Sequence, residues 1–257
     1  MRWNRNLEDL NFTLGLLMGG GSFQINHWKK KYLQYRIIIK LKKDKDNINM
    51  LRELRNNYGI GTINISSKFV LWAINHKKEV KWFIKLILKN SEKLLSLSPR
   101  TKLKVMKMDY GLNNNLSYNE FSYLEKINSN NWIVIEKEDI NIYNYIEDEK
   151  FCWWLAGFTE AQGCFCIRKN GNQSFSIGQK IDYEILEIIK ILFDLPNTIR
   201  EQSEKFYVIE TYNIKSCIAI IKFFDKYKLR GNKSITYEYF KSHVKSKYKF
   251  KSFKDVV

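Results

Sequence analysis

Few residues of this chain are spaced for chemistry, and the candidates lie in two similar segments, 14–23 (LGLLMGGGSF) and 156–165 (AGFTEAQGCF). A carboxylate in such a segment could bind a divalent cation, because hard cations prefer oxygen ligands. Glu160 is the one acid in the two segments, and Gln162 two residues later offers a neutral amide. In a helix these two side chains would point about 200° apart. A lone Glu160 is more typical of a helix end or an interface than of a catalytic group.

Other reaction types find no matching motif. The three histidines, His27, His76 and His243, are far apart in the sequence, which argues against acid–base catalysis. The four cysteines form no CxxC pair, so we expect buried or half-buried reduced thiols and no zinc site. The glycine run 19–21 is not followed by Lys-Ser or Lys-Thr, so it is not a nucleotide-binding loop.

Small residues in both segments predict a close contact between two helices. Gly15 and Gly19 are four residues apart, as are Gly157 and Ala161. Residues at this spacing share one helix face, and small side chains there let two backbones approach closely. Because each pair opens a similar stretch of chain, we expect the two helices to pack on a pseudo-two-fold axis. Their C-terminal ends would then meet at the centre of the molecule.

The stretches that follow the two segments have the same order of predicted elements. Alternating apolar residues predict strands, and spacings of three or four predict amphipathic helices. After the first segment we expect strands at 22–26, 32–40, 62–66 and 69–74 and helices at 44–58 and around 80–87. After the second we expect strands at 164–168, 174–180, 198–202 and 206–212 and helices at 183–193, 216–227 and 233–244. Each copy therefore reads αββαββα.

This order predicts an α/β (α+β) protein in which two pseudo-symmetric repeats form a saddle of antiparallel sheets. We expect a first repeat at 1–110, a linker with a short helix at 111–150, and a second repeat at 151–257. One face of each sheet should be covered by helices and the other should stay open. The chain would act as a monomer with an internal pseudo-two-fold axis.

Strand alternation also assigns the side chains of the open faces. Gln, Asn, Arg and Lys can read base edges and hold phosphates, and hardly any acids share the predicted faces. The lysine-rich turn 28–31 is suited to phosphate contacts, and Trp72 and Tyr207 could stack on bases. The predicted nucleic-acid-binding residues are Ser22, Gln24, Asn26, Lys29, Lys30, Lys31, Gln34, Arg36, Lys40, Cys166, Arg168, Ser176, Lys180, Arg200 and Gln202.

The net charge of +17, from 44 Lys+Arg against 27 Asp+Glu, indicates a polyanionic partner. We expect no membrane partner, because the basic residues are spread along the chain and no apolar run approaches the roughly 20 residues that span a bilayer. Alanine and proline are scarce while Lys, Asn and Ile abound, which favours an AT-rich gene. An organelle-encoded protein needs no targeting peptide, so the mitochondrial matrix is the expected location.

The two segments resemble the motif of the LAGLIDADG homing endonucleases and intron maturases, whose single-chain members have this two-repeat layout. The resemblance covers nearly the whole chain and implies sheet faces that lie along DNA grooves. It also implies a metal-binding acid at the end of each motif helix, and these positions align with Gly20 and Gln162. Neither residue is an acid, so we expect no metal site, and Mg²⁺ only if the protein is an endonuclease after all.

Three functions remain open at this point. The resemblance and the vacant acid positions favour a non-catalytic protein that binds structured RNA, as a maturase or as a component of an organellar ribonucleoprotein such as a ribosome. The alternative is a site-specific double-stranded DNA endonuclease, with its chemistry intact or removed. A third is a DNA-binding protein without a cutting role. Gln for Glu is a substitution that an experimenter would choose, but decay after recruitment to another role explains both positions.

Overall fold

The computed structural model describes residues 7–127 and 143–248 and contains the predicted order of elements twice. The first repeat consists of α1 (Leu7–Gly20), β1 (Gly21–Trp28), β2 (Tyr32–Lys42), α2 (Lys45–Tyr58), β3 (Thr62–Ile65), β4 (Phe69–Ile74) and α3 (Lys77–Leu95). The second consists of α7 (Glu149–Gln162), β5 (Gly163–Ile167), β6 (Gln173–Lys180), α8 (Tyr183–Leu192), β7 (Arg200–Ser203), β8 (Phe206–Thr211) and α9 (Ile214–Lys226), followed by α10 (Asn232–Tyr248). The αββαββα prediction is therefore confirmed in both copies.

The segment between the repeats is more helical than the predicted linker. Helix α4 (Pro99–Asn114) runs into the range 111–150, and α5 (Tyr118–Ile127) and α6 (Tyr143–Ile146) lie within it. Helix α4 has a proline in its first turn, where the missing N–H is not needed, and ends at Asn115 with a positive φ of 51°. Residues 128–142 of the predicted linker lie outside the described residues.

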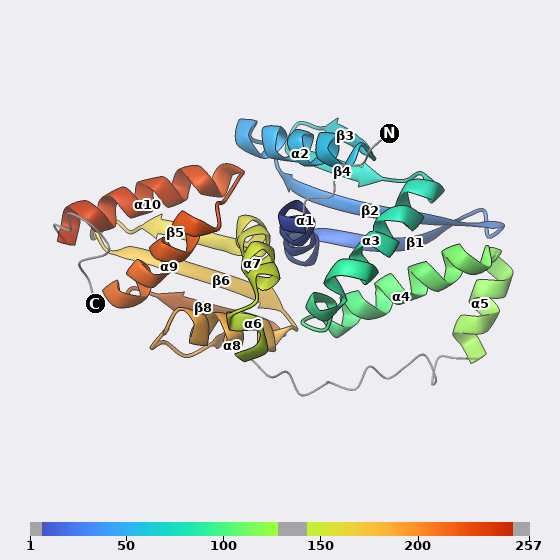
Figure 1. Ribbon diagram of the computed structural model, residues 1–257. Coiled ribbons are helices and arrows are strands. Elements are labelled where there is room, and N and C mark those ends of the chain that lie inside the picture. The colour runs from blue at the N-terminus through green and yellow to red at the C-terminus, as the bar shows by residue number, and fades with distance from the viewer. Residues whose placement is uncertain (1–6, 128–142, 249–257) are drawn as a thin grey trace.

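The strands form two four-stranded antiparallel sheets, with the orders β1-β2-β4-β3 and β5-β6-β8-β7. The two sheets lie side by side, and α1 and α7 lie together between them (Figure 1). Helix α3 crosses in front of β1 and β2 in this view, and α9 crosses in front of β5 and β6. Each sheet therefore has one face covered by helices, as the alternating strand sequences predict.

Local sequence signals explain where the helices begin and end. The Asp44 side chain accepts a hydrogen bond from the Asp46 backbone and caps α2, which stops at Gly59 in the left-handed conformation. Helices α7 and α9 are capped in the same way by Asp148 and Asn213. These signals lie within a few residues of each helix end, which is why sequence analysis placed most boundaries correctly.

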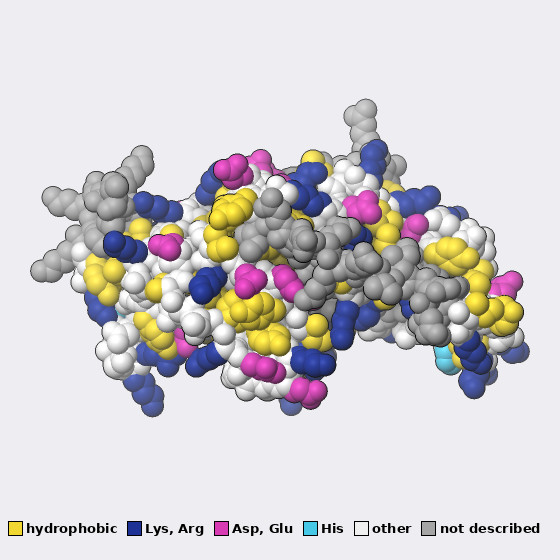
Figure 2. All heavy atoms as spheres, turned by 90° about the horizontal axis from the view of Figure 1, so that it is seen from below, with side chains coloured by type: hydrophobic (Ala, Val, Ile, Leu, Met, Phe, Trp, Pro, Cys, Tyr) yellow, Lys and Arg dark blue, Asp and Glu magenta, His cyan; other side chains and the backbone are white. Residues whose placement is uncertain are grey.

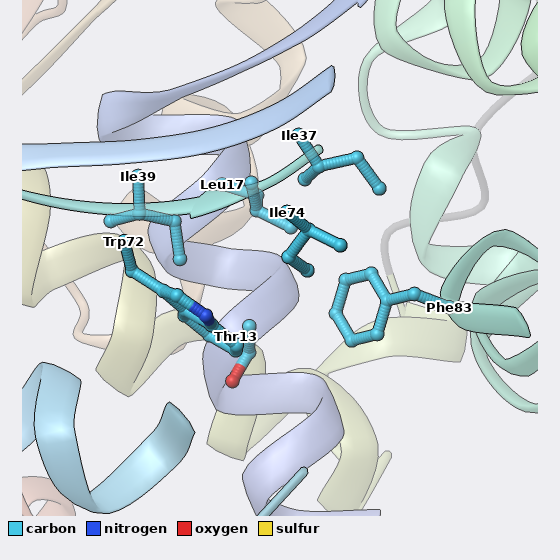
Figure 3. Close-up of a pocket in the computed structure, with 7 residues that line it drawn as sticks. All are labelled: Thr13, Leu17, Ile37, Ile39, Trp72, Ile74 and Phe83. Atoms are coloured by element: carbon cyan, nitrogen blue, oxygen red, sulfur yellow. The ribbon is translucent and has the colours of Figure 1, made fainter. Parts of the chain in front are cut away.

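The core joins both repeats through the motif helices. Figure 3 shows one part of it, where side chains of α1, β2, β4 and α3 converge on a space too small to hold a water molecule. The residues that line it are Thr13, Leu17, Ile37, Ile39, Trp72, Ile74 and Phe83. Such close packing fixes the orientation of α1 against the first sheet. This space is a layer of the core and has no room for a ligand.

Candidate nucleic-acid interface

The contact between α1 and α7 depends on residues without a side chain. A Cβ atom added to Gly15 would lie 1.9 Å from the Trp154 carbonyl oxygen, and one added to Gly157 would lie 1.9 Å from the Phe12 carbonyl oxygen. A Cβ on Gly19 would lie 2.8 Å from the Cβ of Ala161. The structure therefore brings all four small residues of the predicted seam into one helix–helix contact.

This contact brings the ends of the two motifs to a shared central point. Helix α1 ends at Gly20 and α7 ends at Gln162, and each helix continues directly into the first strand of its sheet. The side-chain amide of Gln162 donates a hydrogen bond to the Gly19 carbonyl oxygen across the seam. A Cβ added to Gly20 would lie 3.3 Å from the Cβ of Ala161. Residues 20 and 162 are thus neighbours, although 142 positions separate them (162 − 20).

Glu160 points away from this centre and binds the start of α10. Its carboxylate accepts hydrogen bonds from the backbone N–H groups of Arg230 and Gly231, both at 3.1 Å, and of Lys233 at 2.9 Å. Burial raises the pKa of Glu160, and the three N–H donors oppose this rise. An acid at a helix N-terminus stabilises the unpaired N–H groups there. The contacts of Glu160 are those of a structural residue at a helix end.

The central residues do not fit a carboxylate-held metal ion. Gly20 has no side chain, and the Gln162 amide is engaged with the Gly19 carbonyl. Glu160 is 4% exposed and turned toward α10. Across the described ranges, 7–127 and 143–248, no three His, Cys, Asp or Glu residues come together as a metal site. We therefore derive no reaction step through Mg²⁺ at this centre.

The open face of the first sheet carries a connected row of polar side chains. The Asn26 amide donates to Gln24, and the Gln24 amide donates to the Ser22 hydroxyl at 2.9 Å. On the neighbouring strand the Arg36 guanidinium donates to the Asn75 side chain at 2.8 Å. The exposed Lys40 ammonium lies 4.0 Å from the Phe69 ring centroid. These contacts order the side chains while leaving further donors free to meet a ligand.

The rest of the predicted first-repeat set lies on the same hairpin. Gln34 is exposed and pairs with Asn26 across β1 and β2. Lys29, Lys30 and Lys31 form the exposed turn between these two strands. The structure thus places all nine predicted first-repeat residues on β1, β2 and their turn.

The open face of the second sheet contains an acid that sequence analysis missed. Glu210 on β8 accepts a hydrogen bond from Arg168 at 2.5 Å and another from Arg200 at 3.3 Å. This carboxylate raises the pKa of Arg168, which also lies 4.9 Å from the Tyr212 ring centroid. The prediction of an open face with hardly any acids is therefore wrong at its most basic point. Alternation along 206–212 would have placed Glu210 on this face.

The remaining predicted second-repeat residues share this face but not this cluster. Ser176 pairs directly with Glu210 across β6 and β8, whereas Cys166 is exposed on β5. Lys180 is exposed at the end of β6, and Gln202 is exposed at an irregularity in β7. The second face is therefore less basic than the first.

The two predicted stacking aromatics are wrong. Trp72 is 2% exposed, donates a hydrogen bond to the Ile60 carbonyl oxygen and stacks on Tyr58 in the core. Tyr207 packs edge-on against Tyr183 of α8, on the helix side of the second sheet. Both strands alternate in the predicted way, but the register places these rings on the covered face.

The thiols also differ from expectation. Cys152 and Cys217 are buried, but Cys164 and Cys166 are exposed. The exposed pair lies two residues apart on β5, where alternation directs both side chains to the open face.

Charge is unevenly distributed over the surface. The face seen from below carries acidic side chains near its middle, while Lys and Arg side chains line its lower margin (Figure 2). None of the helices that the structure describes has the length and apolar character needed to cross a membrane.

Comparison with known proteins identifies the lineage of this architecture. A sequence model described as LAGLIDADG endonuclease matches residues 13–97 and 155–244, which include the seam and both sheets. The chain belongs to the LAGLIDADG endonuclease family. The resemblance of the two motif segments is thereby confirmed.

Two relatives share about a third of their residues with this LAGLIDADG chain. The probable intron-encoded endonuclease aI3 of Debaryomyces hansenii is 34% identical, over 86% of this chain and 36% of that protein. A protein of the same name from Dictyostelium citrinum is 33% identical, over 90% of this chain and 93% of its own length. The chain thus spans little more than a third of the first relative and nearly all of the second.

Solved structures of LAGLIDADG meganucleases have the same fold. The meganuclease I-CpaMI bound to uncleaved DNA matches with a TM-score of 0.69 and 20% identity, over 93% of this chain and 92% of that one. The homing endonuclease I-GzeII in complex with its DNA target matches with a TM-score of 0.69 and 19% identity, over 93% and 91%. These comparisons favour the DNA-endonuclease alternative and do not support the predicted preference for RNA.

Proposed function

We propose that this chain is a sequence-specific double-stranded DNA-binding protein of the homing endonuclease lineage, which no longer cuts DNA through the usual pair of acids. The observation that carries the proposal is the central point of the saddle. There the motif helices deliver Gly20 and Gln162 between two polar sheet faces. Binding surfaces are present, and carboxylates at the centre are absent from both motif positions.

The open faces have the chemistry that duplex recognition requires. Ordered Gln, Asn and Arg side chains can form paired hydrogen bonds with base edges in the major groove, and lysines can neutralise phosphates. The row from Ser22 to Asn26 and the Arg36–Asn75 pair are ordered in this way. Relatives are named endonucleases, and structures of the same fold hold DNA, which supports DNA as the partner.

Phosphodiester hydrolysis in the usual way needs an oxyanion that can hold Mg²⁺ beside the scissile phosphate. A glycine supplies no ligand at all, and an amide whose N–H group is bonded to the Gly19 carbonyl supplies at most a neutral oxygen. We therefore infer that bound DNA stays intact at the centre of the saddle. Loss of cutting with retention of binding suits a role in which occupancy of a site is the product.

We further propose an organellar origin, with the mitochondrial matrix as the location. The scarcity of alanine and proline supports an AT-rich gene, and relatives are named intron-encoded endonucleases. A shorter match to 38% of the chain, at 28% identity, is an uncharacterized mitochondrial protein of Saccharomyces cerevisiae.

Selection from a randomised duplex library tests the proposal. We expect the purified chain to enrich one asymmetric site, because the two half-sites meet different faces. Binding should weaken steeply with salt, and Arg36→Ala should reduce the preference for the selected site. Lys169→Ala, at the exposed turn of the second hairpin, provides a comparison that removes charge without removing an ordered base-reading group.

Incubation of the selected duplex with Mg²⁺ or Mn²⁺ should leave both strands whole. Site-specific cleavage by the unaltered chain would show that the catalytic part of the proposal is wrong. Enrichment of no duplex, combined with tight binding to a structured RNA, would overturn the choice of DNA.

A further inference from the structure

We propose that the tip of the first hairpin, residues 28–32, is a binding site for the unpaired nucleotides of a single-stranded nucleic acid. The site lies at the outer end of the first open face, beyond the ordered row of polar side chains. It goes beyond duplex recognition, because stacked and paired bases have no free ring face to offer. We call this segment the hairpin tip.

Two aromatic rings are exposed at the hairpin tip. Trp28 and Tyr32 pair directly across β1 and β2 and are 58% and 67% exposed. Alternation places them on the open face, since the neighbouring pair on that face is Asn26 and Gln34. Core packing does not explain two large rings on a polar face. Aromatic side chains on a basic surface are the usual platform for unpaired bases, whose ring faces stack on them.

The charge of the hairpin tip fits the same ligand. Lys29, Lys30 and Lys31 form the turn, and the Lys29 ammonium lies 5.7 Å from the Trp28 ring centroid. No Asp or Glu occurs anywhere in residues 21–42. A ligand that offers negative charge and flat ring faces together is a nucleic-acid strand with unstacked bases.

The turn itself holds its lysines at a conformational cost. The Lys31 N–H donates to the Trp28 carbonyl oxygen at 2.9 Å, and Lys29 and Lys30 have φ values of 48° and 54°. A two-residue turn of this kind favours Asn-Gly, because other side chains are disfavoured at positive φ. The second hairpin uses Gly171 at its positive-φ position. Folding alone therefore does not account for lysines in the first turn.

A separate helix supports the hairpin tip from behind. The His27 ring packs edge-on against Tyr118 of α5, with centroids 4.6 Å apart, and Tyr32 forms an isolated bridge with Ser117. The tip of the β1–β2 hairpin reaches the corner between α4 and α5 (Figure 1). This helix pair lies outside the segments that match the family, 13–97 and 155–244. The support fixes the rings in place before a ligand arrives, which lowers the entropy cost of binding.

Fluorescence anisotropy with short labelled strands tests the site on the full chain. The probes are oligothymidine and oligouridine of about 8 nucleotides, an abasic strand of the same length, and a duplex of matched charge. Variants W28L and Y32L remove a ring each, whereas W28F keeps one. The variant K29N/K30G removes two charges while supplying the residues that the turn prefers, so it should fold at least as well. K169N removes a lysine from the second hairpin turn as a control.

We expect W28L and Y32L each to weaken binding of the two base-containing single strands by roughly 5- to 150-fold, the equivalent of one lost base–aromatic stack. W28F and K169N should stay within about threefold of the unaltered chain on the same scale. K29N/K30G should weaken binding of every strand, the abasic one included. Similar losses with oligothymidine and oligouridine would show that the site reads ring faces, and a preference for one would identify the sugar it favours.

The abasic strand and the duplex separate this proposal from duplex recognition. W28L should leave both affinities within about threefold, because neither probe offers an unpaired base. Equal losses of W28L on the abasic strand or the duplex would overturn the proposal, as would unchanged binding of oligothymidine. Concentration-dependent self-association that disappears in W28L would identify a second copy of the chain as the true occupant and would also overturn it.

Discussion

Gly157 of α7 lies so close to the Phe12 carbonyl oxygen of α1 that an added Cβ atom would stand 1.9 Å from it. Backbone faces backbone at this point, so no flexible side chain can move aside. The reciprocal contact between Gly15 and the Trp154 carbonyl oxygen has the same distance. The position of the centre, and of both sheets relative to it, therefore depends on two glycines.

We expect Gly157→Ala to lower the free energy of unfolding by more than about 3 kcal/mol, the upper end for an overpacked core, because the helices must separate. Gly20→Ala is the matched control, since its Cβ would meet a side-chain carbon at 3.3 Å. That change should stay within about 1 kcal/mol, helped by the higher helix propensity of alanine. Urea unfolding followed by circular dichroism measures both. Equal stability of the two variants would contradict the seam.

Glu160→Gln should destabilise the protein by about 1–3 kcal/mol, because the new NH₂ group opposes backbone N–H groups at the start of α10. The carboxylate accepts three such bonds, and an amide oxygen can replace it for only part of them. Hydrogen exchange should show the loss first in residues 230–236. Affinity of the folded protein for DNA should not change, since Glu160 lies away from the open faces. A selective loss of DNA binding would assign it a different role.

Glu210→Gln should increase affinity for non-specific duplex DNA and reduce the preference for the selected site. The substitution releases Arg168 and Arg200 from a shared carboxylate, so both can neutralise phosphates while losing their fixed orientation. The slope of log K against log [salt] should steepen by about 1. Glu201→Gln is the control, because Glu201 accepts a hydrogen bond from the Lys205 backbone and contacts neither arginine. Binding that weakens for all sequences would contradict this account of Glu210.

Thiol labelling should distinguish two classes of cysteine. Cys164 and Cys166 should react in the native protein, whereas Cys152 and Cys217 should react only after unfolding. Burial raises the pKa of the Cys217 thiol to about 12 and also raises that of Cys152, which keeps both protonated. Mass spectrometry after alkylation identifies the sites. Bound duplex should protect the exposed pair, and unchanged labelling with saturating DNA would argue against binding on the second open face.

Restoring acids at the centre should restore chemistry. Gly20→Asp combined with Gln162→Glu places two carboxylates at neighbouring helix ends, and the space at Gly20 admits a side chain with a shift of a few tenths of an ångström. We expect Mg²⁺-dependent cleavage of the selected duplex by the double variant. Gly20→Asn with Gln162 retained is the uncharged control and should not cut. Cleavage by that control at the same rate would remove the carboxylates from the explanation.

The sequence by itself determined the features that depend on neighbouring residues. Alternation assigned Phe23 to the core and Gln24 to the open face, and the glycine spacing predicted the helix seam, because both follow from the periods of strand and helix. The lack of acids at Gly20 and Gln162 was also visible in the sequence alone. These features need only the local geometry of the chain and a repeat of known order.

Tertiary structure decided the features whose partners are distant in the sequence. Glu160 finds its N–H donors seventy positions away, at Arg230 and beyond, and Glu210 joins two arginines of different strands. The ring of Trp72 went to the core because the strand register, not its residue type, chose its face. The support of the hairpin tip by Tyr118 came from a helix in the predicted linker. Local periodicity cannot specify such contacts, because they exist only after the elements have packed.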